Sequence, residues 1–310
     1  MKSNACLSRR SFLKSATGFA ASAGLIRPLQ MMAADAMTPA VIVGAHPWVY
    51  AAKQPKYDIT PVLPQIFADM SYAGMGGVEL MHSALFPDDA VERIGELSRK
   101  HNLPVLGASF GGAMWDRAKH QEVLDDAAKA IPRLAKLGGR TLGTSVGAIK
   151  WNGKIRKTPD QLDAQAEVLR KIIALCEQNG IVLNLHNHTY EVENDLHDLK
   201  GTLARIPDVK LGPDLNWLVR AGVDPAAFIR QFGKQIVFLH LRDQKKDGRW
   251  SEALGEGDTD FAAIAAALRE IRFAGRAVIE LAHERDFQLT RPLRESLKMS
   301  REFVRKVLGY

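Results

Sequence analysis

Cysteine and long apolar runs are scarce in this sequence, and their absence removes several classes of protein. Cys6 and Cys176 are the only cysteines among the 310 residues, and Cys6 precedes the main part of the chain, so we expect a hydrophobic core and no internal disulfide. No run of about 20 apolar residues follows the N-terminal region, so we expect no membrane anchor in the mature protein. A G-x-G-x-x-G turn after the first apolar strand is also missing, which argues against an open dinucleotide-binding sheet.

Excess charge is also small once the N-terminus is set apart. The whole chain has a formal net charge of +7, and residues 1–36 carry +4 of it, which leaves +3 for the remainder. A net charge so close to zero gives little support for a basic surface that would bind nucleic acid. We therefore expect no nucleic-acid partner.

The first 36 residues match an export signal. Ser8–Lys14 reads SRRSFLK, which fits the twin-arginine motif, and a weakly apolar stretch follows from Ala16 to Ile26. Ala34–Ala36 supplies an A-x-A cleavage site. We predict that residues 1–36 are a twin-arginine (Tat) signal peptide that engages the Tat translocase. The mature protein would begin near Met37 and would be periplasmic or otherwise exported.

The rest of the chain, residues 37–310, alternates short apolar β-type runs with longer amphipathic helical patterns. Helix starts are marked by an N-cap residue followed by proline, at Thr60, Thr158 and Asp224. Eight strand-helix repeats with strands apolar on both faces predict a parallel sheet that closes on itself. The expected fold is a single-domain α/β (β/α)8 TIM barrel. The eight strands are expected to begin near Val41, Gly76, Leu103, Gly139, Ile181, Val209, Ile236 and Ala277.

Polar residues end four consecutive strands. The fifth strand ends in His186 and His188, the sixth in Asp214, the seventh in His240 and the eighth in Glu280. In a parallel barrel these ends meet at one mouth, where catalysis takes place. Two buried carboxylates and two imidazoles call for a compensating cation, and this donor set suits Mn²⁺, with Mg²⁺, Co²⁺, Fe²⁺ or Zn²⁺ as alternatives. Each residue alone could equally be a packed core group or a helix cap.

Several longer segments match the motifs of one family. They are His186–His188 followed by Glu191, Gly212–Trp217 with Arg220–Pro225, His240–Asp243, Leu254–Phe261 and Val278–Glu280. Through these segments the chain resembles the xylose-isomerase-like TIM barrels, the sugar phosphate isomerase/epimerase superfamily. The segments cover the C-terminal half closely, whereas the N-terminal half matches mainly in the alternation of strand and helix patterns.

The resemblance implies a divalent metal held by residues from strands five to eight. Asp214, His240 and Glu280 carry over as ligands. Many members have Glu at the end of strand five, where this chain has His186, with His188 one pleat further out. We favour His186 as the ligand, and His188 is the alternative. Glu280 and His188 are the candidates for proton transfer, because paired acid and base groups perform this chemistry.

Five other side chains are candidates for substrate binding. Arg242 could hold a substrate oxygen, and His46 and Glu79 could bind sugar hydroxyls, although capping or core roles suit them equally. Trp217 could stack on the apolar face of a sugar ring, although packing is the default for a single aromatic residue. Glu191 follows the HNH segment and belongs to the same group.

These features predict a metal-dependent isomerase or epimerase that abstracts the proton next to a sugar carbonyl. Since sugar phosphates stay in the cytoplasm, an exported enzyme would act on an unphosphorylated sugar or keto-sugar. Because histidine replaces one carboxylate, a lyase or hydratase acting on a 3-keto-sugar or keto-glycoside is the main alternative. A non-catalytic sugar-binding protein ranks behind both. The sequence predicts no oligomeric state.

Overall fold

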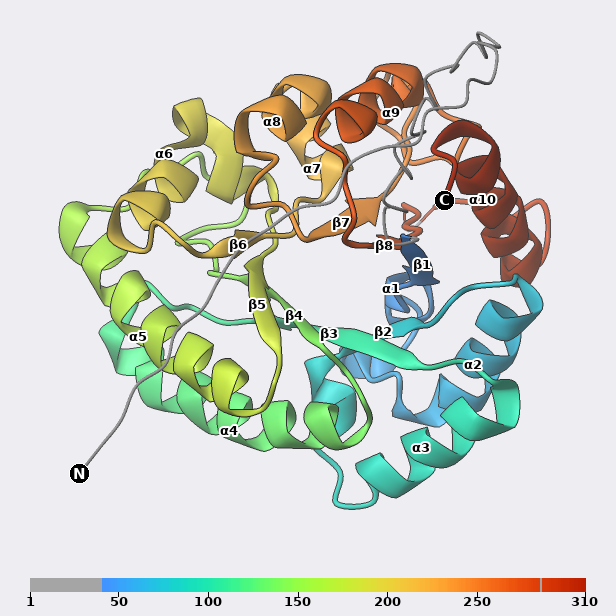
Figure 1. Cartoon of the computed structure of the whole chain (residues 1–310), viewed down its shortest axis with the longest axis horizontal. Coiled ribbons are helices and arrows are strands. Elements are labelled where there is room, and N and C mark those ends of the chain that lie inside the picture. Colours follow the sequence, from blue (N-terminus) through green and yellow to red (C-terminus); the bar gives the residue numbers. More distant parts are fainter. Residues whose placement is uncertain (1–40, 285) are drawn as a thin grey trace, which may run out of the picture. The chain divides into compact units, whose positions relative to one another are not determined.

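The computed structural model describes residues 41–284 and 286–310, so the predicted signal peptide and the boundary at Met37 lie outside the described residues. Eight parallel strands form one sheet in the order β6-β5-β4-β3-β2-β1-β8-β7. Bridges between Leu211 and Ile236 and between Asp214 and His240 join its two edges, so the barrel is nearly closed (Figure 1). The strands are β1 (Ile42–Ala45), β2 (Val78–Met81), β3 (Val105–Gly111), β4 (Thr141–Ser145), β5 (Val182–Leu185), β6 (Lys210–Leu211), β7 (Phe238–Leu241) and β8 (Arg276–Ile279).

Helices surround this ring on its outer side (Figure 1). Neighbouring helices pack in chain order, and α10 packs against α2, so the last and the first long helices complete the outer layer. The α-helices are α1 (Trp48–Ala51), α2 (Leu63–Tyr72), α3 (Ala90–His101), α4 (His120–Lys136), α5 (Pro159–Gln178), α6 (Thr189–Arg205), α7 (Leu215–Arg220), α8 (Pro225–Phe232), α9 (Phe261–Glu270) and α10 (Leu293–Val307). Short 3-10 turns are η1 (Pro55–Tyr57), η2 (Thr60–Val62), η3 (His82–Leu85) and η4 (Arg117–Lys119). The predicted single-domain (β/α)8 TIM barrel is thus confirmed.

Two of the three predicted helix starts agree with the structure. Thr158 forms a capping box with Gln161 at the start of α5, and the Asp224 carboxylate accepts a backbone hydrogen bond at the start of α8. The start at Thr60 is wrong, because Thr60 begins the turn η2 and α2 begins at Leu63. The Asp58 side chain accepts a hydrogen bond from the Thr60 N–H, which holds this segment in a turn before the helix.

The inside of the barrel changes from apolar to polar along its axis. Leu106, Phe238 and Val278 form a small apolar cluster of their own, separate from the main core between strands and helices. One pleat beyond Phe238 on the same face of β7 comes His240, and one pleat beyond Val278 on β8 comes Glu280. Apolar residues therefore fill the N-terminal end of the barrel, and polar residues face its C-terminal mouth.

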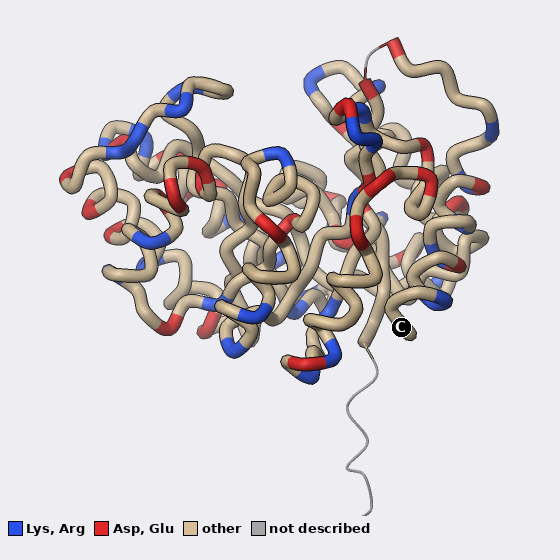
Figure 2. Tube along the Cα trace, turned by 90° about the horizontal axis from the view of Figure 1, so that it is seen from above, with Lys and Arg blue, Asp and Glu red and all other residues tan. Residues whose placement is uncertain are grey.

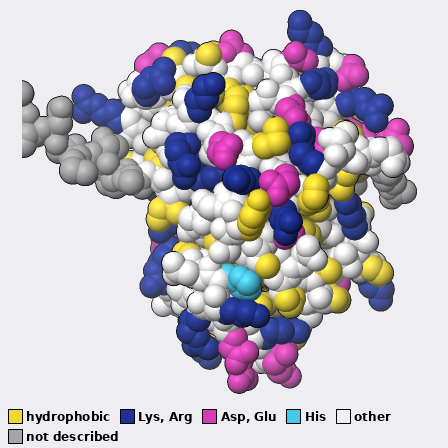
Figure 3. Space-filling model, turned by 90° about the vertical axis from the view of Figure 1, so that its right-hand side faces the viewer, with side chains coloured by type: hydrophobic (Ala, Val, Ile, Leu, Met, Phe, Trp, Pro, Cys, Tyr) yellow, Lys and Arg dark blue, Asp and Glu magenta, His cyan; other side chains and the backbone are white. Residues whose placement is uncertain are grey.

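Charged side chains of both signs are interspersed along the chain (Figure 2). On the face seen in Figure 3, Lys and Arg side chains lie among acidic and apolar ones. The small positive excess is therefore spread over that face and does not form a single basic stripe. Within the described part of the chain, no helix is both long and apolar enough to cross a lipid bilayer.

Candidate active site

A cavity of about 320 Å³ opens at the C-terminal ends of the strands. The connections that follow β1, β5 and β8 each contribute side chains, because parallel strands end at the same mouth. Predicted residues that line the cavity are His46, His186, His188, His240 and Glu280. The fold therefore brings together strand-end residues that are far apart in the sequence.

Arg242 joins two carboxylates beside this cavity. Its Nε lies 2.8 Å from Asp214 Oδ2, and a terminal guanidinium nitrogen lies 2.5 Å from Glu280 Oε1. All three side chains are buried, with Asp214 fully inaccessible. Burial alone would raise the pKa of Glu280, but Arg242, His46 and His240 together outweigh burial and hold that pKa well below its usual range. Glu280 is therefore a carboxylate that remains ionised.

Asp214 also begins a helix. Its Oδ1 accepts hydrogen bonds from the backbone N–H groups of Asn216 and Trp217 at 2.9 and 3.0 Å, which makes it the N-cap of α7. Only Oδ2 remains for Arg242, and that contact is close but poorly aligned as a hydrogen bond. One residue thus fixes a helix start and supplies half of the pairing for a buried arginine.

His240 is held between a carboxylate and a second imidazole. Its Nε2 lies 2.7 Å from Glu79 Oε2, and its Nδ1 lies 3.1 Å from His186 Nδ1. Burial opposes protonation of His240, but the adjacent Glu79, with Glu280 and Asp214, outweighs burial and raises the pKa of His240 to about 9. Burial and the neighbouring His240 hold the pKa of His186 well below its usual range. A protonated His240 therefore donates to both Glu79 and a neutral His186.

We call Glu79, Asp214, His240, Arg242 and Glu280 the charged cluster. It contains three carboxylates, one guanidinium and one imidazole with a raised pKa, and none of its side chains is more than 5% exposed. His46 lies at its edge, with Nδ1 3.2 Å from Glu280 Oε1 and Nε2 2.9 Å from the Ser109 hydroxyl. The acidic groups of the cluster thus have partners within the chain.

The segment after β5 adds His186, His188 and Tyr190 to the cavity lining, and we call these three residues the imidazole wall. The His188 Nδ1 lies 3.1 Å from the Tyr190 hydroxyl, and the two rings stack with centroids 5.3 Å apart. Burial lowers the pKa of His188 to about 3, with a smaller contribution from the charge of Arg242. His188 is therefore neutral at ordinary pH.

Glu191 supports the imidazole wall through hydrogen bonds without lining the cavity itself. Its Oε2 accepts the His188 backbone N–H at 2.7 Å, and its Oε1 accepts the Ser145 hydroxyl at 2.7 Å. Ser145 Oγ also lies 2.8 Å from the Tyr190 hydroxyl, so hydrogen bonds run from His188 through Tyr190 and Ser145 to Glu191. Burial raises the pKa of Glu191 to about 7. Both oxygens of Glu191 are used by protein donors, and the side chain does not line the cavity.

Of the five residues predicted to bind substrate, His46 alone lines this cavity among the described residues. Arg242 and Glu79 are engaged in the charged cluster, and Glu191 is engaged as above. Trp217 is buried and packs edge-on against Trp151. Direct contact of these four with substrate stays a prediction that would need side chains to move.

Sequence reasoning missed three polar residues that line or support the cavity, namely Ser109, Ser145 and Tyr190. Ser109 lies near the end of β3 and Ser145 ends β4. Extending the search for polar residues at strand ends from the last four strands to these two would have found both. Tyr190 lies two residues after His188, inside the first turn of α6, and its sequence position gave no comparable signal.

The predicted metal ligands His186, Asp214, His240 and Glu280 come close together, but their arrangement does not fit a divalent ion. Within residues 41–284 and 286–310, no group of three or more His, Cys, Asp or Glu side chains is arranged to hold a metal. The free oxygen of Asp214 and one oxygen of Glu280 face the permanently charged Arg242, and His240 Nε2 faces Glu79. Of the two alternatives at strand five, His186 is the one beside His240.

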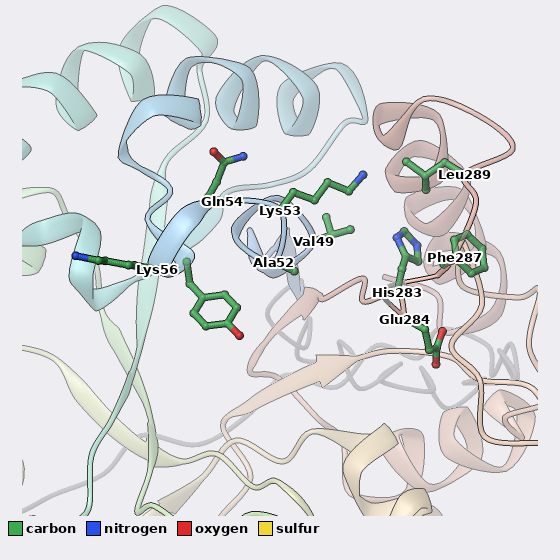
Figure 4. A pocket seen from close by; sticks show the side chains of 10 residues that line it. Val49, Ala52, Lys53, Gln54, Lys56, His283, Glu284, Phe287 and Leu289 are labelled. Carbon is green, nitrogen blue, oxygen red and sulfur yellow. The ribbon is translucent and has the colours of Figure 1, made fainter.

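A second hollow, of about 470 Å³, lies between the segment after β1 and the segment after β8 (Figure 4). In Figure 4, Val49 and Lys53 face His283, Phe287 and Leu289 across it. None of the predicted site residues lines this hollow. It is therefore separate from the predicted site, although it has a histidine and a carboxylate of its own in His283 and Glu284.

Fold and site together define a (β/α)8 barrel whose mouth carries acid–base side chains. The sequence profile described as "Xylose isomerase-like TIM barrel" matches residues 67–305, and the chain belongs to that family. Inosose dehydratase from Clostridium perfringens strain 13 is 22% identical over 270 residues, covering 78% of this chain and 89% of that protein.

Solved structures show the same fold at low identity. D-allulose 3-epimerase from Methylomonas sp. has a TM-score of 0.70 at 19% identity, covering 86% of this chain and 98% of that one. The apo 3-keto-D-glucoside 4-epimerase from E. coli has a TM-score of 0.67 at 16% identity, covering 86% and 100%. The chain is thus a xylose-isomerase-like TIM barrel that shares its fold with sugar epimerases and is similar, at low identity, to a protein named inosose dehydratase.

Proposed function

We propose that this protein is an isomerase/epimerase-like enzyme that removes the proton from the carbon next to the carbonyl of an unphosphorylated sugar or keto-sugar. The observation that carries the proposal is a cavity with an ionised carboxylate, Glu280, and the imidazoles of His186 and His188 on its lining. Its volume of about 320 Å³ suits a small polar ligand. Acid and base groups that face one buried space are what α-proton transfer requires.

Glu280 and His188 are the groups that we assign to proton transfer. Glu280 presents a carboxylate to the cavity while Arg242 fixes its position. His188 reaches the cavity from the imidazole wall, and its hydrogen bond to Tyr190 orients the ring. His186, anchored through Nδ1 on His240, can use its other ring nitrogen to hold the oxygen on which negative charge develops.

A lyase or hydratase acting on a keto-sugar or keto-glycoside is the second candidate. The composition of the cavity lining favours it, because the carboxylate of Glu280 meets the imidazoles of His186 and His188 there and not a second, matching carboxylate. The similarity to a protein named inosose dehydratase points in the same direction. Both candidates begin with removal of the same α-proton and differ in the step that follows.

No step in this proposal passes through a metal, because the predicted ligands do not fit one in the arrangement above. Export through the Tat pathway remains part of the proposal and is the reason for choosing an unphosphorylated substrate. Replacing Arg9 and Arg10 with Lys should keep the precursor in the cytoplasm. Unchanged export of that variant would remove this restriction on the substrate.

Solvent deuterium exchange tests the proposal. The purified protein in D₂O is incubated with a panel of ketoses, keto-sugars and keto-glycosides, and NMR follows deuterium at the α-carbon. We expect exchange on at least one member, with an epimer as product for an epimerase and a product lacking water or aglycone for a lyase. A matched control is His101→Gln, which alters a histidine at the end of α3 and should exchange at the wild-type rate. No exchange on any member would contradict the proposal.

A further inference from the structure

The position of Arg242 in the sheet explains why it pairs with two acids. It follows β7 directly, and its neighbours are β8 on one side and the end of the β6 segment on the other. Glu280 follows β8, and its N–H donates to the Leu241 carbonyl; Asp214 follows β6 and bridges to His240 on the other side. Both carboxylates therefore flank Arg242 from adjacent strands, and the planar guanidinium fork suits two such partners.

Each acid of the charged cluster already has a partner within the chain itself. Asp214 lies 2.8 Å and Glu280 2.5 Å from the Arg242 guanidinium, and Glu79 lies 2.7 Å from His240. The need for a cation, which follows from burying carboxylates, is met by the guanidinium. A divalent ion that took the same oxygens would lie beside a side chain that cannot lose its proton. Strand five adds an imidazole, His186, and so supplies no further negative charge to attract an ion.

We infer that Arg242 is the resident cation of this site, taking the position that a divalent metal would occupy, and that the protein holds no metal there. Arg242 is a positioning residue that holds the carboxylates of Asp214 and Glu280 in place below the cavity. Only the role of the charged cluster in catalysis rests on the proposed function. The absence of a bound metal does not, because metal binding can be measured without any substrate.

The wild-type protein provides the first test. Full chain is expressed in medium supplemented with Mn²⁺, Co²⁺ and Zn²⁺, dialysed, and analysed for metals by mass spectrometry. We expect less than about a tenth of an equivalent per chain, and no change in Tm on adding EDTA or MnCl₂. About one equivalent of metal, with a Tm that EDTA lowers and Mn²⁺ restores, would overturn the inference. Absence of deuterium exchange in a metal-free protein would count against the proposed function alone.

Two matched variants test whether Arg242 itself takes the metal's place. Arg242→Gln removes the charge, so the two carboxylates should gain Mn²⁺ binding, seen as a Tm rise of about 5 °C with excess MnCl₂. Arg242→Lys keeps a positive charge and should show no such rise. If both variants behaved alike, another group would supply the charge and the inference would be wrong. Should Arg242→Gln fail to fold without metal, its refolding yield with and without Mn²⁺ gives the same comparison.

Discussion

The charged cluster and the imidazole wall face the same cavity but are stabilised in different ways. In the charged cluster each acid has a cationic partner within 3 Å, so removing one member leaves another buried and uncompensated. In the imidazole wall the contacts are neutral hydrogen bonds and ring stacking. The charged cluster therefore depends on charge pairing and presents one of its acids, Glu280, to the cavity, whereas the imidazole wall presents neutral rings.

Asp214→Ala should have the largest effect, on stability. It removes the N-cap of α7 and one of the two partners of Arg242, so the free energy of unfolding should fall by about 3–5 kcal/mol. Denaturant unfolding measures this. The control is Asp195→Asn, which breaks an exposed pair with Lys200 and should change stability by less than about 0.5 kcal/mol. Equal effects would remove the distinction between the charged cluster and an ordinary surface pair.

Glu280→Gln should have the next largest effect, and on activity first. The amide keeps the size of the side chain but loses the charge and basicity, so turnover should fall at least about a hundredfold. Arg242 would keep Asp214 as a partner, so this variant should lose less stability than Asp214→Ala. Steady-state kinetics and denaturant unfolding of the same preparation separate the two losses. Near-normal turnover would exclude Glu280 from proton transfer.

Ser145→Ala probes the support of the imidazole wall. It removes the link between Tyr190 and Glu191 while leaving His188 in place. Activity should fall by about tenfold, less than for a direct acid–base group, and stability by about 1–3 kcal/mol because a buried carboxylate loses a donor. Ser83→Ala on η3, outside this chain of hydrogen bonds, is the control. Unchanged kinetics in Ser145→Ala would show that His188 does not depend on the hydrogen bonds through Ser145.

Trp151→Ala should have the smallest effect. Trp151 is 51% exposed and contacts His188 and Tyr190 edge-on, so its loss should leave stability within about 0.5 kcal/mol. As an aromatic surface next to the cavity, it should affect KM more than kcat, by about threefold to tenfold for a stacking contact with a sugar. A drop in kcat at constant KM would show that Trp151 acts by orienting His188.

Much of the fold could be read from the sequence because strand and helix periodicities are local. Eight apolar runs, the capping residues at Thr158 and Asp224 and the absence of a dinucleotide turn were enough to indicate the barrel. The failure at Thr60 has a local cause too, since Asp58 turns the chain before α2 begins.

The sequence predicted which side chains meet at the site, but not which of them form pairs. Strand-end histidines and carboxylates do meet at one mouth, as parallel topology requires. What the sequence could not show is that Arg242 reaches both Asp214 and Glu280, because that depends on which strands become neighbours when the barrel closes. The argument that buried acids need a cation was sound, and the chain itself offers one in Arg242.

Deuterium exchange by wild type and His188→Gln tests the central claim most directly. The claim is that Glu280 and His188 transfer a proton next to a sugar carbonyl while the pairing within the charged cluster stays intact. It predicts exchange by the wild type and a fall of at least about a hundredfold in His188→Gln, with an unfolding midpoint close to that of the wild type. Exchange at the wild-type rate in His188→Gln, with a stable fold, would contradict it.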